Sequence, residues 1–129
     1  MKPSPSAVGI VVTDMAASLA FYRSLGLDVP DEPAPHVEIA FGALRLLLDT
    51  EEVVASFDPS FTPPTGAGRV GLALECASPA EVDAEYDRLV GAGYRGRLAP
   101  FDAVWGQRYA AVLDPDGVGV DLFAGGSAP

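Results

Sequence analysis

The side chains that most often carry out nucleophilic catalysis are scarce in this chain of 129 residues. His36 is the only histidine and Cys76 the only cysteine. A Ser-His-Asp or Cys-His arrangement would need His36 as its base. Cys76 lies in an apolar stretch, which favours a buried structural thiol, and it has no second cysteine for an internal disulfide. No glycine-rich loop has a recognised phosphate-binding spacing. These residue types disfavour nucleophilic catalysis and phosphate binding.

Acidic residues outnumber basic ones by 18 to 8, which gives a formal net charge of −10. Such a surface repels nucleic acid and attracts cationic partners over long range. The alternative is that the charge serves only solubility. The acidic stretch Asp114-Pro115-Asp116-Gly117 could suggest a calcium site, but proline and glycine there are typical of a tight hairpin turn. We therefore expect no nucleic-acid partner and no calcium site.

The strands and helices that must position any functional side chain are encoded by a sequence repeat. Residues 8–27 return 64 positions later as residues 72–91, so that Ile10 matches Leu74 and Tyr22 matches Tyr86. The matches fall on core-type and helix-cap positions, which a shared backbone requires. Two copies with such a long period indicate a duplicated module, because a solenoid needs three or more stacked units.

Each half is predicted to run strand, helix, strand, strand, strand, and the fold class is α+β. Asp14 caps a helix that starts at Met15 and stops at Gly26. Ser78 caps a second helix that starts at Pro79 and that Gly91 and Gly93 end. The predicted strands cover residues 7–13, 37–41 and 44–48 in the first half and residues 69–76, 97–102, 107–113 and 118–124 in the second. Residues 50–68 are predicted to be an irregular crossover.

Length and hydrophobic content predict one compact domain over residues 1–129, with 49% of the residues hydrophobic. Module one covers about 7–50, the crossover about 51–68 and module two about 69–124. No apolar run approaches the roughly 20 residues of a membrane span, and no signal-peptide pattern opens the chain. A cytoplasmic location is therefore the expectation.

The chain resembles the vicinal oxygen chelate superfamily, which contains glyoxalase I, extradiol dioxygenases, fosfomycin-resistance enzymes and bleomycin-resistance proteins. The resemblance is carried by Val12-Thr13-Asp14, Ser18-Leu19-Ala20-Phe21-Tyr22, Leu25-Gly26-Leu27, Trp105-Gly106-Gln107-Arg108-Tyr109 and Asp114-Pro115-Asp116-Gly117. It implies two tandem βαβββ modules whose curved mixed sheets surround a cup-shaped cavity, and it implies a homodimer.

Enzymes of this family hold a metal ion, commonly with two histidines and a glutamate. The resemblance places Ala7, Gly71 and Asp121 at these three positions. Alanine and glycine offer no side-chain donor, and a catalytic metal site wants at least two or three protein ligands. His36 stands on a different strand from these positions and would have to recruit Glu38 or Asp121 to replace them. We therefore expect no metal and no other cofactor.

Without a metal, the chain is most similar to the bleomycin-resistance branch, whose members sequester a basic antibiotic unchanged. That similarity predicts metal-independent binding of a small aromatic or cationic compound, such as an antibiotic. The stacking candidates are Trp105, Phe101, His36 and Tyr109. The candidates for pairing with a ligand cation are Glu38 and Asp121, neither of which has an obvious partner close in the sequence.

Each candidate also has a structural interpretation. Trp105 could belong to the core or a dimer interface, Tyr109 to the core, and Glu38 to a solvated face. Asp121 could be explained by a hydrogen bond to Arg108 or Arg69. The alternative function is an enzyme of the same superfamily. It would be either a divergent glyoxalase or dioxygenase relative, or a metal-free isomerase, lyase or cyclase in which Asp121 or Glu38 has a raised pKa and acts as base.

Overall fold

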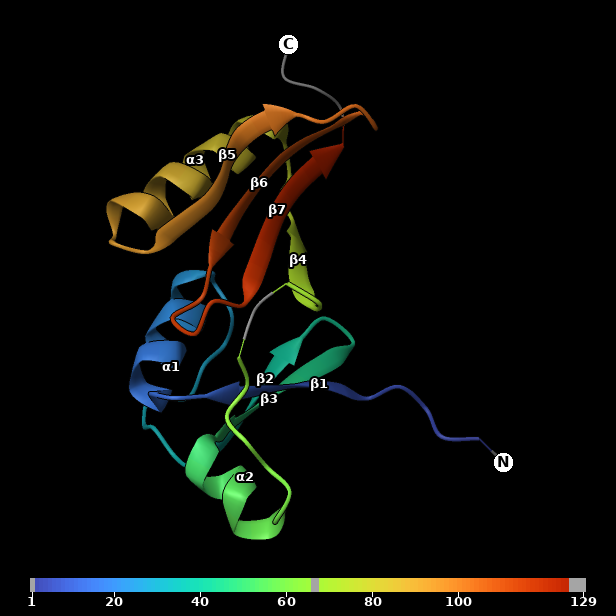
Figure 1. The fold of residues 1–129 in the computed structure, drawn as a ribbon. Helices are drawn as coiled ribbons and strands as arrows, with labels where there is room; N and C mark the ends of the chain where they lie inside the picture. The colour runs from blue at the N-terminus through green and yellow to red at the C-terminus, as the bar shows by residue number, and fades with distance from the viewer. Residues whose placement is uncertain (1, 66–67, 126–129) are drawn as a thin grey trace. The chain divides into compact units, whose positions relative to one another are not determined.

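The computed structural model describes residues 2–65 and 68–125, and the chain divides into two compact units, residues 1–65 and 66–129. Each unit contains one mixed β-sheet with helical cover (Figure 1). The predicted α+β class is confirmed. Within the described residues, no helix has the length and apolar character needed to cross a membrane.

The first unit runs β1 (Ala7–Val12), α1 (Met15–Ser24), β2 (His36–Phe41), β3 (Leu44–Thr50) and α2 (Glu51–Phe57). Its strand order is β1-β3-β2, with β1 parallel and β2 antiparallel to β3. Apolar side chains alternate along the strands and are buried on one face. The fully or almost fully buried residues include Val12, Leu19, Phe21, Tyr22, Ile39, Leu46 and Leu48.

The second unit runs β4 (Gly71–Glu75), α3 (Pro79–Gly91), β5 (Arg95–Asp102), β6 (Gln107–Leu113) and β7 (Gly119–Gly125). Its strand order is β4-β7-β6-β5, with β4 parallel to β7 and the other pairs antiparallel. Helix α3 packs against β5, β6 and β7 (Figure 1). The buried residues of this unit include Val82, Leu89, Ala110, Val112, Val120 and Leu122.

The helix signals of the repeat are confirmed at both starts and both ends. The Asp14 carboxylate accepts a hydrogen bond from the Ala17 amide (3.1 Å), and the Ser78 hydroxyl accepts one from the Glu81 amide (3.2 Å). Just beyond the two helices, Gly26 and Gly93 adopt φ of 88° and 102°. Glycine reaches this left-handed region without the steric penalty of a Cβ, so both helices end where predicted.

The two units differ in the strand that follows the long helix. In each unit the last strand of the sheet is parallel to the first, so β3 corresponds to β7 and β2 to β6. Strand β5 therefore has no counterpart in the described residues of the first unit. The segment 28–35 occupies its place in the chain and contains Pro30, Pro33 and Pro35. Proline has no amide hydrogen for a strand ladder, which explains the missing strand.

The predicted irregular crossover at residues 50–68 is wrong in its first part, because α2 begins directly after β3. Thr50 caps this helix by accepting a hydrogen bond from the Val53 amide (3.2 Å), and Glu51 and Glu52 stand in its first turn. Acidic residues there are favourable beside the positive end of the helix dipole. A helix of seven residues is too short to show a clear hydrophobic period, so only its cap could have revealed it.

The turn at Asp114 to Gly117 is a hairpin turn, as predicted. The Asp114 side chain is only 1% exposed, and its Oδ1 accepts hydrogen bonds from the Asp116 and Val118 amides, both at 2.8 Å. Gly117 adopts φ of 89°. The Asp114 carboxylate therefore has a structural role, because it accepts the backbone hydrogen bonds that hold the turn in shape.

Candidate functional site

Three of the predicted stacking residues form an aromatic cluster on the second unit, which we define as Phe101, Trp105 and Tyr109. Phe101 pairs with Tyr109 across β5 and β6, so both side chains lie on one sheet face. The Trp105 ring lies edge-on to both, with ring centroids 6.5 Å from Phe101 and 5.5 Å from Tyr109. Trp105 is 60% exposed, which excludes the interpretation of Trp105 as a core residue of this unit.

The turn between β5 and β6 positions the Trp105 ring. Gly106 adopts φ of 89° and donates its amide hydrogen to the Ala103 carbonyl (3.0 Å). Ala103 in turn donates to the Gln107 carbonyl (2.8 Å), which closes the hairpin. The indole Nε1 of Trp105 donates to the Gln107 side chain (2.9 Å). The ring is therefore held at its polar edge, while much of its surface faces solvent.

Asp121 on β7 extends the aromatic cluster with a carboxylate. The Tyr109 hydroxyl donates a hydrogen bond to Asp121 Oδ2, and Arg97 Nη2 lies 3.4 Å from Oδ1. Burial and the hydrogen bond to Asp121 raise the pKa of Tyr109 to about 12, so the phenol remains a donor at neutral pH. The carboxylate is oriented by these two partners, neither of which was predicted.

Arg108 is not the partner of Asp121. Its Nε donates to Asp83 of α3 (2.9 Å), and its Nη1 lies 3.3 Å from Asp102. Because neighbouring side chains alternate along a strand, Arg108 faces α3 and Tyr109 faces away from it. The alternative explanation of Asp121 by a hydrogen bond to Arg108 is therefore wrong, and the arginine that contacts Asp121 is Arg97. The aromatic cluster and Asp121 occupy the sheet face that α3 leaves open.

His36 and Glu38 lie on the first unit in a row of polar side chains. His36 Nδ1 is 2.6 Å from Asp49 Oδ1, and its Nε2 is 3.1 Å from Glu38 Oε2. The Arg45 guanidinium donates to Glu38 Oε1 and also to the Ser6 hydroxyl (2.9 Å). Glu38 was expected to lack a local partner, and this is wrong, because Arg45 and His36 both contact it.

The titration behaviour of this row follows from its contacts. The hydrogen bonds to Glu38 and then Asp49 raise the pKa of His36. The hydrogen bond from His36, with Arg45 adding its positive charge, lowers the pKa of Glu38. A general base near neutral pH would need the opposite shift. The interpretation of Glu38 as a base with a raised pKa is therefore wrong.

The structure thus brings four of the predicted site residues together on the second unit, namely Phe101, Trp105, Tyr109 and Asp121. The other two, His36 and Glu38, contact each other on the first unit. The polar partners Arg97 and Gln107 were missed. The strand alternation of β6 and β7 could have placed Gln107 beside Tyr109. Arg97 could not be assigned to a face, because the pairing of β5 with β6 shifts register between Gly96 and Leu98.

The fold and this arrangement define an α+β protein built from two related sheet units, one of which exposes an aromatic and acidic face. Residues 5–122 match the model of the family described as the glyoxalase/bleomycin resistance protein/dioxygenase superfamily. The chain belongs to this superfamily, as its motifs predicted.

Relatives and solved structures agree with this assignment. An uncharacterised protein of Mycobacterium bovis is 27% identical over 114 residues, which cover 84% of this chain and 74% of that protein. A glyoxalase/bleomycin resistance protein/dioxygenase family enzyme from Burkholderia phytofirmans has a TM-score of 0.81 at 20% identity, covering 92% of this chain and 96% of that chain. A lactoylglutathione lyase from Agrobacterium tumefaciens has a TM-score of 0.70 at 24% identity, covering 97% and 96%. At these identities the solved structures show a shared fold.

The three family metal positions do not fit a metal ion in this chain. Ala7 opens β1 and Gly71 opens β4, and neither side chain carries a donor atom. A Cβ at Gly71 would stand 3.3 Å from the Gly119 carbonyl oxygen, so this position is also crowded by the neighbouring strand. Asp121 is left as a single carboxylate. In the described part of the chain, no three His, Cys, Asp or Glu side chains gather as a metal site would require.

Proposed function

We propose that this protein binds and sequesters a small planar compound that carries a positive charge, without using a metal ion and without altering the compound. The observation that carries the proposal is the aromatic cluster beside Asp121 on an open sheet face. The exposed indole of Trp105 offers a flat apolar surface, and aromatic rings attract both other rings and cations. Sequestration of an antibiotic with this chemistry is one such function.

The charge of the site supports a ligand that is both planar and cationic. Arg97 contacts Asp121 at 3.4 Å, a long distance for an ion pair, and the Asp121 carboxylate retains lone pairs that a ligand donor can reach. A cation stacked on an exposed ring gains about 0.5–1 kcal/mol. The net charge of −10 adds long-range attraction for such a ligand.

Metal-independent binding is supported by the donor set. Of the three family positions, only Asp121 has a side chain that can coordinate a metal ion. One carboxylate is fewer than the two or three protein ligands that metal-assisted chemistry requires at these positions. The proposal also includes a homodimer and a cytoplasmic location. Sedimentation of the purified protein and cell fractionation test these two parts.

The test is a titration of the protein with a panel of planar cationic antibiotics and metabolites, after its metal content has been measured. Trp105 is the only tryptophan, so its emission reports binding directly. Each bound compound is then recovered and its mass determined. Saturable quenching with an unchanged mass supports the proposal. An altered mass instead supports an enzyme, with Asp121 as the first residue to replace.

Matched variants locate the site by calorimetry, which does not depend on the tryptophan signal. Trp105→Leu and Asp121→Asn should each weaken binding about three- to tenfold. Phe57→Leu is the control, because Phe57 is an equally exposed aromatic residue (69%) on α2 of the other unit. Equal weakening by all three variants, or no binding across the panel, would refute the aromatic cluster as the site.

A further inference from the structure

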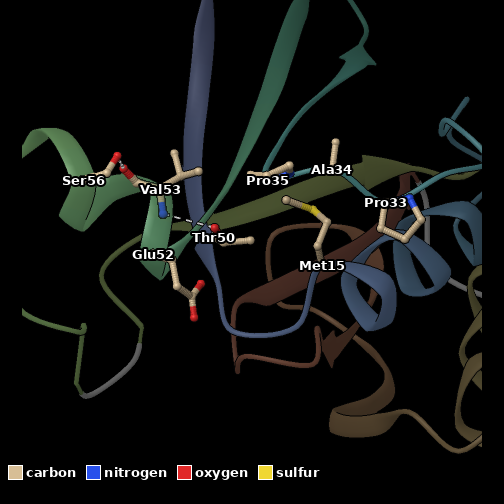
Figure 2. A pocket seen from close by; sticks show the side chains of 8 residues that line it. All are labelled: Met15, Pro33, Ala34, Pro35, Thr50, Glu52, Val53 and Ser56. Carbon is tan, nitrogen blue, oxygen red and sulfur yellow. Dashed lines mark hydrogen bonds between the residues drawn. The ribbon is translucent and has the colours of Figure 1, made fainter.

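A second candidate site lies within the first unit and shares no residue with the aromatic cluster. A solvent-open cavity of about 530 Å³ is formed where the start of α1, the end of β3 and α2 meet the segment before β2 (Figure 2). Its lining residues are Met15, Pro33, Ala34, Pro35, Thr50, Glu52, Val53 and Ser56. The volume is within the range of small-molecule sites, which is about 300–1,000 Å³.

The cavity walls are fixed by local constraints. The Thr50 amide donates to the Pro35 carbonyl (3.0 Å), which attaches the proline segment to the end of β3. The Thr50 hydroxyl also accepts from the Val53 amide (3.2 Å), which attaches α2 to the same residue. Pro33 and Pro35 have a fixed φ and lose little freedom when a ligand binds. Such a preformed cavity lowers the entropic cost of binding.

Most of the lining surface is apolar. Figure 2 shows the Met15 side chain extending from α1 toward Ala34 and Pro35, with Val53 on the opposite wall. The hydroxyl of Ser56 donates to the Val53 carbonyl (2.6 Å), so its hydrogen is already used. Methionine is flexible and polarizable, which lets it adapt to an apolar ligand body.

Glu52 is the one charged residue of the lining, and its side chain extends from the first turn of α2 (Figure 2). It forms no ion pair or hydrogen bond with another residue in the ranges 2–65 and 68–125. The first unit contains nine acidic and three basic residues. Arg23 donates to the Pro30 carbonyl and Arg45 to Glu38. Both arginines of this unit therefore contact groups other than Glu52, which leaves the Glu52 carboxylate available to a cation from outside the chain.

We propose that this cavity binds a small organic ammonium ion with a compact apolar body. The body packs against Met15, Pro35 and Val53, and the ammonium group pairs with the Glu52 carboxylate. Apolar contact area supplies most of the affinity, and the charge pair sets the preference for amines. The proposal does not depend on the aromatic cluster, so either can fail without the other.

The test uses 1-aminoadamantane, a rigid apolar amine with no aromatic ring, in a two-dimensional NMR titration of the labelled full chain. We expect saturable shifts at the amides of Ala34, Val53 and Ser56 and none at the Trp105 indole N–H. Adamantan-1-ol and adamantane-1-carboxylate have the same body without the positive charge. They should bind up to about fivefold more weakly, the upper end of the contribution of an exposed ion pair.

Glu52→Gln and Glu51→Gln form the matched pair of variants, because both remove one charge from the first turn of α2 and only Glu52 lines the cavity. Glu52→Gln should weaken amine binding about fivefold, and Glu51→Gln less than twofold. Ala34→Phe should fill the cavity and abolish the shifts. The proposal is overturned by equal effects of the two glutamine variants, by equal binding of the alcohol, by shifts confined to Trp105, or by no shifts at millimolar amine.

Discussion

Replacing Gly96 with alanine should destabilise the second unit, although the same change usually strengthens a strand. Gly96 lies in β5, where the ring of Tyr86 from α3 covers its Cα. A Cβ added at Gly96 would overlap the Tyr86 hydroxyl oxygen and would stand 2.9 Å from Tyr86 Cζ and 3.2 Å from Cε2. Real Cβ contacts are longer, so the ring would have to move out of its packed position.

The expected magnitude combines two opposing terms. Overpacking costs about 1–3 kcal/mol, and alanine in place of a strand glycine gains about 0.5–1 kcal/mol. The free energy of unfolding should therefore fall by about 1–2 kcal/mol, measured by urea denaturation with an unchanged slope. Gly9→Ala in β1 is the matched control, because no atom lies within 4 Å of its added Cβ. That variant should be as stable as the wild type or about 0.5 kcal/mol more stable.

A double-mutant cycle attributes the loss to the tyrosine. Once Tyr86 has been replaced with alanine, the further change Gly96→Ala should become neutral or stabilising, because nothing remains for the new Cβ to meet. The coupling energy between the two changes should then equal the overpacking term, about 1–3 kcal/mol. The reasoning is refuted if Gly96→Ala is as stable as Gly9→Ala, or if its cost is unchanged without the Tyr86 ring.

Three further predictions concern titration, a buried carboxylate and the thiol. Because Glu38 and then Asp49 raise the pKa of His36, the stability contributed by its charged form is complete below about pH 6.5 and is lost as pH rises through the raised value. The stability difference between wild type and His36→Gln should therefore shrink from pH 6 to pH 9 in urea melts, and a constant difference would contradict this. Asp114→Ala removes the acceptor of two backbone amides and should cost about 2–3 kcal/mol in the same assay, whereas a loss under about 0.5 kcal/mol would show that these bonds contribute little. Burial first, with nearby acidic residues, raises the pKa of Cys76 to about 11, so Ellman's reagent at pH 8 should label the unfolded protein and leave the folded protein nearly unlabelled.

The sequence predicted the helices and most strands because their signals are local. The caps at Asp14 and Ser78 and the glycines that end the helices act within one turn of the chain. The repeat and the family motifs then predicted how these helices and strands combine, which gave the fold class. The crossover helix was missed because α2 spans only seven residues, for which a hydrophobic period cannot be distinguished.

The residues of the aromatic cluster could be selected from the sequence, but the contacts that they make could not be predicted from it. Trp105, Tyr109 and Asp121 could be selected from their strands and motifs, and the structure places them together. Their partners depend on register, and the irregular pairing of β5 with β6 hides the face that Arg97 occupies. The same limit explains why Arg45 on β3 was missed as a partner of Glu38, whereas His36 lies two residues before Glu38 on β2 and could have been placed beside it from strand alternation.

The sequence alone therefore determined most of the elements, the fold class, the family and the lack of side-chain donors at two of the three family metal positions. These follow from residue identity and from interactions between near neighbours in the chain. Only the tertiary structure decided which side chains pair across strands, how the Tyr109 and His36 pKa values shift, and where a cavity forms. These properties depend on distances between residues far apart in sequence, and one residue of register moves a side chain to the opposite face of a sheet.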